Sequence, residues 1–308
     1  MKISYVIPCY KSEETIEAVV LEIKGEMDRL NRYTYEIILV NDASPDNTME
    51  KIKYLCTEYE NITGVELAKN FGQHSAVMAG ISLATGDIIC CLDDDGQTPA
   101  NEVGKLLDKI EEGYDVVYAR YPIMKKAAWR SFGTLINKKM TESMLNKPKE
   151  LEITSYFCMK SFIAREILKY KNSYPYLMGL VLRSTKNICN VDVNHRARTV
   201  GKSGYSLFSL IALWINGFTA FSVKPLRIAT FTGVFVAICG FIYAIWAIIH
   251  KIINPIAPMG WSSTIALTLI LGGAILFVLG IIGEYIGRIY ICINNSPQYV
   301  IRKVYTKE

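Results

Sequence analysis

The sequence lacks several features that mark common classes of protein. Its 308 residues include three histidines and eight cysteines, and no two cysteines show the C-x-x-C spacing of zinc sites. The first apolar run is short and ends near Pro8, so it has neither the h-region nor the cleavage site of a signal peptide. We expect reduced, mostly buried cysteines and an N-terminus in the cytosol.

The sequence also lacks a strong excess of charge of one sign. Its net charge of +5 comes from 34 basic and 29 acidic residues, which excludes the polybasic face of a typical nucleic-acid-binding protein. Internal repeats and low-complexity tracts are absent. Hydrophobic residues, by contrast, make up 51% of the chain, which is high for a purely soluble enzyme. We therefore expect part of the chain to lie in lipid.

Before about residue 200, short β-rich runs alternate with amphipathic stretches of helical period. Ser12 is typical of a helix start, and so are Asp46 and Thr48 before the second helix. This order predicts an α/β fold with a doubly wound sheet. The expected strands are Ile3–Ile7, Tyr35–Val40, Ile62–Glu66, Asp87–Leu92 and Asp115–Ala119, and the expected helices are Glu13–Leu30, Thr48–Tyr59, Gly72–Leu83 and Pro99–Glu112.

Two long uncharged segments follow, Ile228–Ile249 with 22 residues and Trp261–Gly283 with 23. Each is long enough to cross a hydrocarbon core of about 30 Å as a helix. Basic residues flank the pair, whereas the connecting loop offers only Lys251, so the positive-inside rule places both ends in the cytosol. The flanking basic residues are Lys224, Arg227, Arg288, Arg302, Lys303 and Lys307.

The segment Tyr205–Val223 is uncharged but diluted by polar residues, which favours a helix lying in the membrane interface over a third span. Gly283 and Gly287 form a small-xxx-small pair that permits helix packing, and the alternative is that these are glycines of the kind common in membrane spans by chance. A homo-oligomer is possible. The predicted organisation is a cytosolic domain over 1–200, a juxtamembrane interfacial region over 201–227, two transmembrane helices with a short loop over 228–283, and a cytosolic tail over 284–308.

The strongest local signal is the acidic loop Asp93-Asp94-Asp95-Gly96-Gln97, which follows an apolar strand. Three adjacent carboxylates repel one another unless a cation holds them, and hard oxygen ligands suit Mg²⁺ or Mn²⁺. Asp93 and Asp95 alternate to the same side of an extended segment, so they form the expected ligand pair. The alternative is an acidic loop solvated by water.

A second carboxylate, Asp42, ends the second strand, where open α/β sheets bind ligands. It can accept a hydrogen bond from a uracil N–H, while Pro8 and Tyr10 offer an edge and a ring against which a base can lie.

A third cluster lies just before the apolar segments and contains basic residues on a glycine-rich loop. Gly201-Lys202-Ser203 resembles the end of a P-loop, but Arg196 stands where the earlier glycine is needed, so we exclude a P-loop. Arg196, Arg198 and Lys202 can pair with diphosphate or lipid phosphate oxygens. The alternative is a juxtamembrane cluster attracted to anionic lipid.

Jointly these segments resemble the family 2 glycosyltransferases of GT-A fold, and within them the polyprenyl-phosphate branch that includes dolichol-phosphate mannose synthase and bacterial undecaprenyl-phosphate sugar transferases. The resemblance covers nearly the whole chain and implies an enzyme of the bacterial inner membrane. It is carried by Ile7–Tyr10, Val40–Ser44, Lys69–Gln73, Asp93–Gln97, Ala119–Tyr121, Arg198–Ser203 and the paired apolar segments.

The resemblance implies a nucleotide sugar donor, a polyprenyl phosphate acceptor and the following residues. The metal ligands would be Asp93, Asp95 and Gln97, and the nucleotide-binding residues Pro8, Tyr10, Glu13, Asp42, Lys69 and Asp94. The catalytic residues would be Asp93, Asp95, Arg120 and Arg198, and those that bind the acceptor or a phosphate Arg196, Arg198, Lys202 and Ser203.

The chain departs from the family pattern at three places. Relatives carry Asn-Glu where this chain has Lys11-Ser12, so Glu13 is the candidate for that carboxylate, and Gly204 replaces a lysine of the dolichol-type relatives. The stretch Ser155–Cys158 lacks the acid and the arginine of many bacterial members. A phosphate acceptor tolerates the missing acid, because its second pKa is about 6 and it is largely ionised at neutral pH. We therefore expect an inverting single displacement.

Two other functions stay open. A processive polysaccharide synthase usually carries a Gln/Arg-x-x-Arg-Trp motif, and none of the four tryptophans here has it. A catalytically silent scaffold that binds a nucleotide sugar is disfavoured by the intact acidic loop. Donor selectivity rests on loops such as Lys69–Ser75, where His74 is more often structural than a sugar contact.

Overall fold

The computed structural model describes residues 1–121, 147–148, 150–173, 175–194, 224–253, 260–294 and 296–307. The chain divides into two compact units, Met1–Ser206 with Asn295–Glu308, and Leu207–Asn294. The first unit is an α/β domain and the second contains two long helices.

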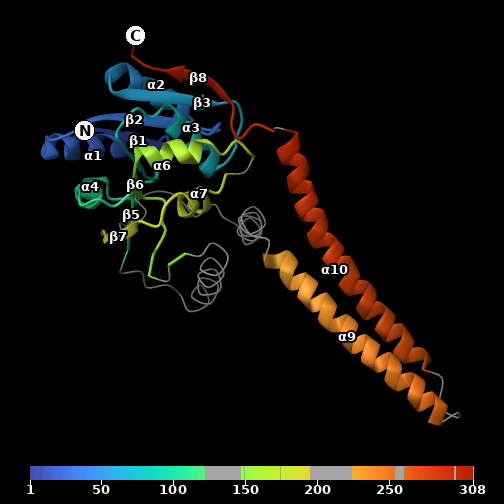
Figure 1. The fold of residues 1–308 in the computed structure, drawn as a ribbon. Coiled ribbons are helices and arrows are strands. Elements are labelled where there is room, and N and C mark those ends of the chain that lie inside the picture. Colours follow the sequence, from blue (N-terminus) through green and yellow to red (C-terminus); the bar gives the residue numbers. More distant parts are fainter. Residues whose placement is uncertain are drawn as a thin grey trace. The chain divides into compact units, whose positions relative to one another are not determined.

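The first unit is built on one eight-stranded sheet of order β7-β5-β6-β4-β1-β2-β3-β8 (Figure 1). β1 pairs in parallel with β2 and β4, and β2 with β3, whereas β6 is antiparallel to both β4 and β5. The prediction of an α/β sheet is confirmed, and the sheet is mixed. The strands are β1 (Lys2–Cys9), β2 (Thr34–Asn41), β3 (Ile62–Leu67), β4 (Ile88–Cys91), β5 (Val116–Arg120), β6 (Phe157–Lys160), β7 (Ile188–Asp192) and β8 (Ile301–Tyr305).

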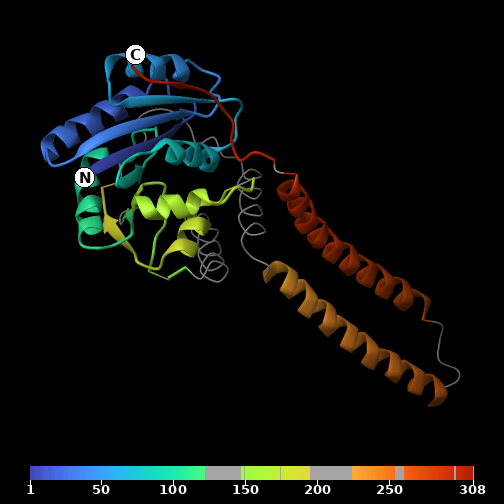
Figure 2. The ribbon, with the colours of Figure 1, turned by 45° about the horizontal axis from the view of Figure 1, so that its top comes forward.

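Helices cover both faces of this sheet (Figures 1 and 2). On one face, Tyr5 of β1 belongs to a buried cluster with Ile23 of α1 and Leu106 of α4. On the other face, α3 packs so closely on the sheet that a Cβ on Gly80 would lie 2.4 Å from a methyl group of Val6. The helices are α1 (Ile16–Leu30), α2 (Thr48–Glu58), α3 (Gln73–Leu83), the 3₁₀ turn η1 (Ala100–Glu102), α4 (Val103–Glu111), α6 (Ser161–Leu168) and α7 (Leu177–Ser184).

Two local predictions are corrected by the structure. The first helix begins at Ile16 rather than at Glu13, because the Ser12 hydroxyl donates to Asp94 and does not cap the helix. Cys90 and Cys158 form a disulfide between paired residues of β4 and β6, so the prediction of reduced cysteines is wrong for this pair. Their separation of 68 residues hides the pairing in the sequence.

The segment after the second apolar helix returns to the α/β unit, where the sequence predicted only a tail. β8 pairs antiparallel with β3 at the edge of the sheet, and the Tyr305 hydroxyl donates to Glu66 at 2.9 Å. The Gln298 amide donates to the carbonyl of Asn172 at 3.2 Å. Residues 296–305 are therefore an integral part of the first unit.

The second unit consists of α9 (Lys224–Ile253) and α10 (Trp261–Ile293), which contact each other. Large apolar side chains lie exposed on both helices, among them Phe235 at 67% and Phe277 at 69%. Within the described residues, Ile270–Ile293 is long and apolar enough to cross a membrane, and α9 contains the shorter apolar stretch Ala229–Tyr243. One span is thus supported, and the second stays a prediction. The predicted interfacial segment lies outside the described residues.

Candidate active site

The polar loops identified in the sequence lie at one edge of the sheet. β1 to β5 all run in the same direction, because β4 and β5 are both antiparallel to β6 and the others are paired in parallel. The loops after their carboxyl ends therefore lie along the same edge, which is where open α/β sheets bind ligands.

Asp94 joins the loop after β4 to the loop after β1. Its carboxylate accepts the backbone N–H of Tyr10 at 3.0 Å and the hydroxyl of Ser12. The loop after β1 is bonded in turn to the loop after β2, since the backbone N–H of Ser12 donates to the Thr48 hydroxyl at 2.8 Å. Burial raises the pKa of Asp94, although the hydrogen bonds from Ser12 and Tyr10 act in the opposite direction. Three strand-end loops thus form one connected network.

Asp93 is held by side chains from two further elements. The amide of Gln73, the first residue of α3, donates to Oδ1 at 2.8 Å, and the hydroxyl of Ser155, just before β6, donates to Oδ2. Burial raises the pKa of Asp93 to about 6, and the neighbouring charges of Asp95 and Asp94 add to this effect. A nearby cation stabilises the charged form of such a carboxylate.

The donor set fits a divalent cation that also binds a diphosphate. Asp93 and Asp95 lie close enough to repel each other, and Asp95 accepts the backbone N–H of Gln97 at 3.1 Å across a turn in which Gly96 has a φ of 71°. In the described part of the chain no group of three or more His, Cys, Asp and Glu side chains could hold a metal. Asp93 and Asp95 would hold the ion, and sites for Mg²⁺ commonly use one or two carboxylates together with substrate phosphates and water. The Gln97 side chain as a ligand stays a prediction.

Asp42 stabilises the loop that leads into α3. It is 3% exposed, and its two oxygens accept the backbone N–H groups of Phe71 at 2.7 Å and Gly72 at 2.8 Å. Gly72 has a φ of 88°, a left-handed conformation that glycine adopts without strain. The Lys69 amine lies 5.0 Å from the centre of the Phe71 ring. Asp42 therefore positions the loop that presents Gln73, a role that its place at a strand end did not predict.

The other predicted nucleotide residues lie along the same edge. Pro8 pairs with Val40 between β1 and β2, and the Tyr10 ring is 46% exposed and free of the core. Glu13 accepts the backbone N–H of Asn47 at 3.0 Å, so its carboxylate closes the loop after β2. The N-cap residue of α2 is Asn47 rather than Asp46, and Asp46 accepts the backbone N–H of Thr48, the first residue of the helix, at 3.3 Å.

Arg120 lies at the carboxyl end of β5 and is paired with Asp192 of the neighbouring β7. The guanidinium makes two hydrogen bonds to this carboxylate, at 2.5 Å from Nε and 3.1 Å from the terminal nitrogen. Both side chains are exposed. The predicted contact of Arg120 with a diphosphate stays a prediction. The predicted phosphate-binding residues Arg196, Arg198, Lys202 and Ser203 lie outside the described residues.

The sequence analysis missed two contacts to the acidic loop, those of Gln73 and Ser155. Gln73 belongs to a segment that carried the family resemblance, and Ser155 lies in a stretch noted only for what it lacks. His74 packs edge-on against Tyr176, with ring centres 5.6 Å apart, and burial lowers its pKa. These contacts support a structural role for His74.

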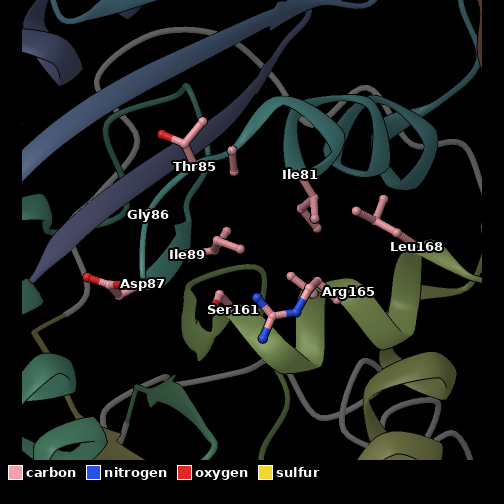
Figure 3. Close-up of a pocket in the computed structure, with 10 residues that line it drawn as sticks. Ile81, Thr85, Gly86, Asp87, Ile89, Ser161, Arg165 and Leu168 are labelled. Atoms are coloured by element: carbon pink, nitrogen blue, oxygen red, sulfur yellow. The ribbon is translucent and has the colours of Figure 1, made fainter.

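A separate pocket of about 220 Å³ lies at the opposite edge of the sheet, between α3 and α6 (Figure 3). Asp87 lines it just before β4, and Ser161 lines it just after β6. The Arg165 guanidinium points toward Ser161 in Figure 3. Because this pocket is at the amino end of β4, it is distinct from the candidate active site.

The chain is similar to known proteins along most of its length. Residues 4–170 match glycosyl transferase family 2, and residues 224–289 match the GtrB C-terminal hairpin. The undecaprenyl-phosphate 4-deoxy-4-formamido-L-arabinose transferase of Yersinia enterocolitica is 34% identical over 318 residues, 98% of this chain and 93% of that protein. The bactoprenol glucosyl transferase of Shigella phage SfII is 32% identical over 315 residues, 98% of both chains.

Among solved structures, the glucosyl-3-phosphoglycerate synthase of Mycobacterium tuberculosis in complex with Mn²⁺, UDP-glucose and phosphoglyceric acid has a TM-score of 0.51 at 18% identity. The match covers 70% of this chain and 76% of that chain, and it shows a shared GT-A-like fold. The family match covers more than half of the chain and includes every strand-end loop from β1 to β4. The chain therefore belongs to glycosyltransferase family 2 and is a glycosyltransferase.

Proposed function

We propose that this enzyme transfers a sugar from a UDP-sugar to a polyprenyl phosphate in a reaction that depends on Mg²⁺ or Mn²⁺ and inverts the anomeric centre. The observation that carries the proposal is the placement of Asp93 and Asp95 together at the carboxyl edge of the sheet. Support for the acceptor comes from relatives similar over 98% of the chain, whose names specify undecaprenyl phosphate or bactoprenol.

In this proposal the acidic loop serves the departing diphosphate. Asp93 and Asp95 would hold the divalent ion, which when bound supplies positive charge to the leaving group. The exposed ring of Tyr10 provides a surface for the base, and Asp94 keeps the backbone of Tyr10 next to the acidic loop. Donor base and diphosphate would thus be bound by loops that are already bonded to one another.

The acceptor needs no general base. An oxygen of the phosphate dianion attacks the anomeric carbon from the face opposite the diphosphate, a new carbon–oxygen bond forms, and the bond to the diphosphate breaks with its electron pair leaving on UDP. Ser155 occupies a stretch in which many relatives carry an acid, and its hydroxyl is engaged with Asp93. A serine at this position is compatible with an acceptor that arrives ionised.

The lipid acceptor requires a catalytic unit held at a membrane. The apolar segment Ile270–Ile293 and the exposed apolar side chains of α9 support this arrangement. We propose that both helices cross the bacterial inner membrane, with the α/β unit in the cytosol and the basic cluster from Arg196 to Lys202 near the lipid phosphate.

The test compares acceptors that differ only in the phosphate. The full chain in detergent micelles is incubated with a panel of UDP- and GDP-sugars and either a short polyprenyl phosphate or the corresponding polyprenol. We expect nucleoside diphosphate release that requires the phosphate and a divalent metal, with one UDP-sugar preferred. Equal release with the polyprenol would contradict the proposed mechanism.

A further inference from the structure

Both carboxylate oxygens of Asp93 accept hydrogen bonds from side chains. Gln73 donates to Oδ1 and Ser155 donates to Oδ2, from positions 20 and 62 residues away in the sequence. One donor comes from α3 and the other from the segment before β6, so the carboxylate is bonded on two sides.

The first donor is mounted on a rigid element. Gln73 is the first residue of α3, and the loop before it is bonded to the buried carboxylate of Asp42 through Phe71 and Gly72. The same helix packs on the sheet at Gly80 without room for a side chain. The backbone of Gln73 is therefore fixed relative to the strands, and only its side-chain torsions remain to be set.

The second donor is fixed in a similar way. The Thr154 hydroxyl, next to Ser155, donates to the carbonyl of Ala119 at 2.9 Å. On the other side of Ser155, Tyr156 is fully buried, and its hydroxyl donates to the carbonyl of Pro99 at 3.3 Å. The Ser155 hydroxyl is thus presented from a segment anchored on both sides.

We infer that Gln73 and Ser155 are positioning residues that orient the Asp93 carboxylate so that it binds a divalent cation together with Asp95. Each carboxylate oxygen has two acceptor positions, so one neutral donor on each oxygen leaves another position for the cation. Hydrogen bonds to the carboxylate of a metal ligand orient that ligand, and their loss typically weakens metal affinity by about 10- to 100-fold. This inference rests on the proposed metal dependence of the reaction.

A purely structural role is the competing explanation. Two neutral donors also satisfy a partly buried carboxylate without any metal, since polar groups removed from water without partners are costly. In that case their removal would lower the stability of the fold and leave the cation affinity of the folded protein unchanged. Direct measurement of cation binding separates the two roles.

The experiment measures Mn²⁺ binding to the metal-free full chain in detergent micelles with UDP present, from the electron paramagnetic resonance signal of free Mn²⁺. We expect Ser155→Ala and Gln73→Ala to weaken binding by about 10- to 100-fold. Ser155→Thr retains a hydroxyl and should recover most of the affinity. Ser184→Ala is the matched control, because this serine bonds a carbonyl within α7 at 2.9 Å.

Thermal unfolding of the same variants completes the test. Unchanged Mn²⁺ affinity in both alanine variants, whatever their thermal midpoints, would overturn the positioning role. The same holds if Ser155→Thr binds as weakly as Ser155→Ala. Sugar transfer by the wild-type protein at full rate without any divalent metal would instead contradict the proposed metal dependence. This assay uses the wild-type protein alone, so its failure is distinguishable from failure of the positioning role.

Discussion

The carboxylate of Asp94 accepts the backbone N–H of Tyr10 at 3.0 Å, which joins the acidic loop after β4 to the loop after β1. The two residues are 84 positions apart, yet adjacent parallel strands bring them to one edge of the sheet. Asp94 also accepts the hydroxyl of Ser12. Although it lies between the two expected metal ligands, Asp94 therefore connects two of the loops that form the candidate site.

Removal of the Asp94 carboxylate should weaken nucleotide binding. In Asp94→Ala, the N–H of Tyr10 and the hydroxyl of Ser12 lose their acceptor, which costs about 1 to 2 kcal/mol and corresponds to a rise of about 5- to 30-fold in the KM for the donor. Asp94→Asn keeps one acceptor oxygen and should show a smaller rise. Steady-state kinetics with both variants test this. A donor KM equal to the wild type in Asp94→Ala would show that this connection does not organise the site.

Arg120 and Asp192 should have unequal effects on turnover. If the Arg120 guanidinium contacts the donor diphosphate, Arg120→Ala lowers kcat/KM by about tenfold or more, typical of a lost charge-stabilising group. Asp192→Ala leaves the arginine in place and free to turn, so turnover stays near the wild-type value. The two residues form an exposed pair, which is weakly stabilising in water. Equal losses in both variants would instead indicate a purely structural pair.

Glu36 should make the stability of the fold depend on pH. Burial alone would raise the pKa of Glu36, but hydrogen bonds from Lys2, Ser4 and Thr85 outweigh it and lower the pKa from 4.5. Since the folded pKa lies below the unfolded value, the ionised form stabilises the fold above pH 4.5, and this stabilisation is lost as the pH falls through the folded pKa.

The matching variant is Glu36→Gln, which removes the charge and keeps the shape. We expect it to be less stable than the wild type by about 1 kcal/mol at pH 7, a value reduced for partial exposure. The difference should shrink as the pH falls below 4.5 and through the folded pKa of Glu36 in thermal unfolding experiments. A difference that is constant between pH 7 and pH 4 would contradict the account of Glu36.

The C-terminal strand should be required for a stable α/β unit. A chain that ends at residue 295 loses β8, and β3 then presents an unpaired edge with exposed backbone groups. The contacts of Gln298 with the loop around Asn172 are lost as well. We expect a lower thermal midpoint and more aggregation, whereas a chain that ends at Tyr305 keeps the strand and should match the wild type. Equal midpoints for both truncations would show that β8 is dispensable.

The features that local patterns encode could be predicted from the sequence. The strand before Asp93 could be predicted because an apolar run is followed directly by carboxylates. The alternation of predicted strands and helices indicated the α/β sheet. β8 was not predicted, because Ile301–Tyr305 is short and rich in basic residues, and it becomes a strand by pairing with a partner more than 200 residues away.

The side-chain partners within the site could not be predicted for the same reason. The residues around Ser12 predict a helix cap, but its hydroxyl donates to Asp94, which lies beyond the end of the adjacent strand. In the sequence, Ser155 is notable only because its stretch lacks the acid found in many relatives. The antiparallel pairing of β6 with β4 brings Ser155 to Asp93. Local sequence specifies most elements of the α/β unit, whereas contacts between distant segments determine the strand β8 and the partners of the polar side chains in the site.

The central claim is that this glycosyltransferase places a sugar on a lipid phosphate, and mass spectrometry of the lipid product tests it most directly. The wild-type chain is incubated with Mn²⁺, undecaprenyl phosphate and a mixture of UDP-sugars, and the extracted lipid is compared with that from Asp95→Ala and from the remote control Arg165→Ala. We predict a lipid heavier by one glycosyl residue with the wild type and Arg165→Ala, and little product with Asp95→Ala. An undecaprenyl phosphate that keeps its mass with every donor would contradict the proposed function.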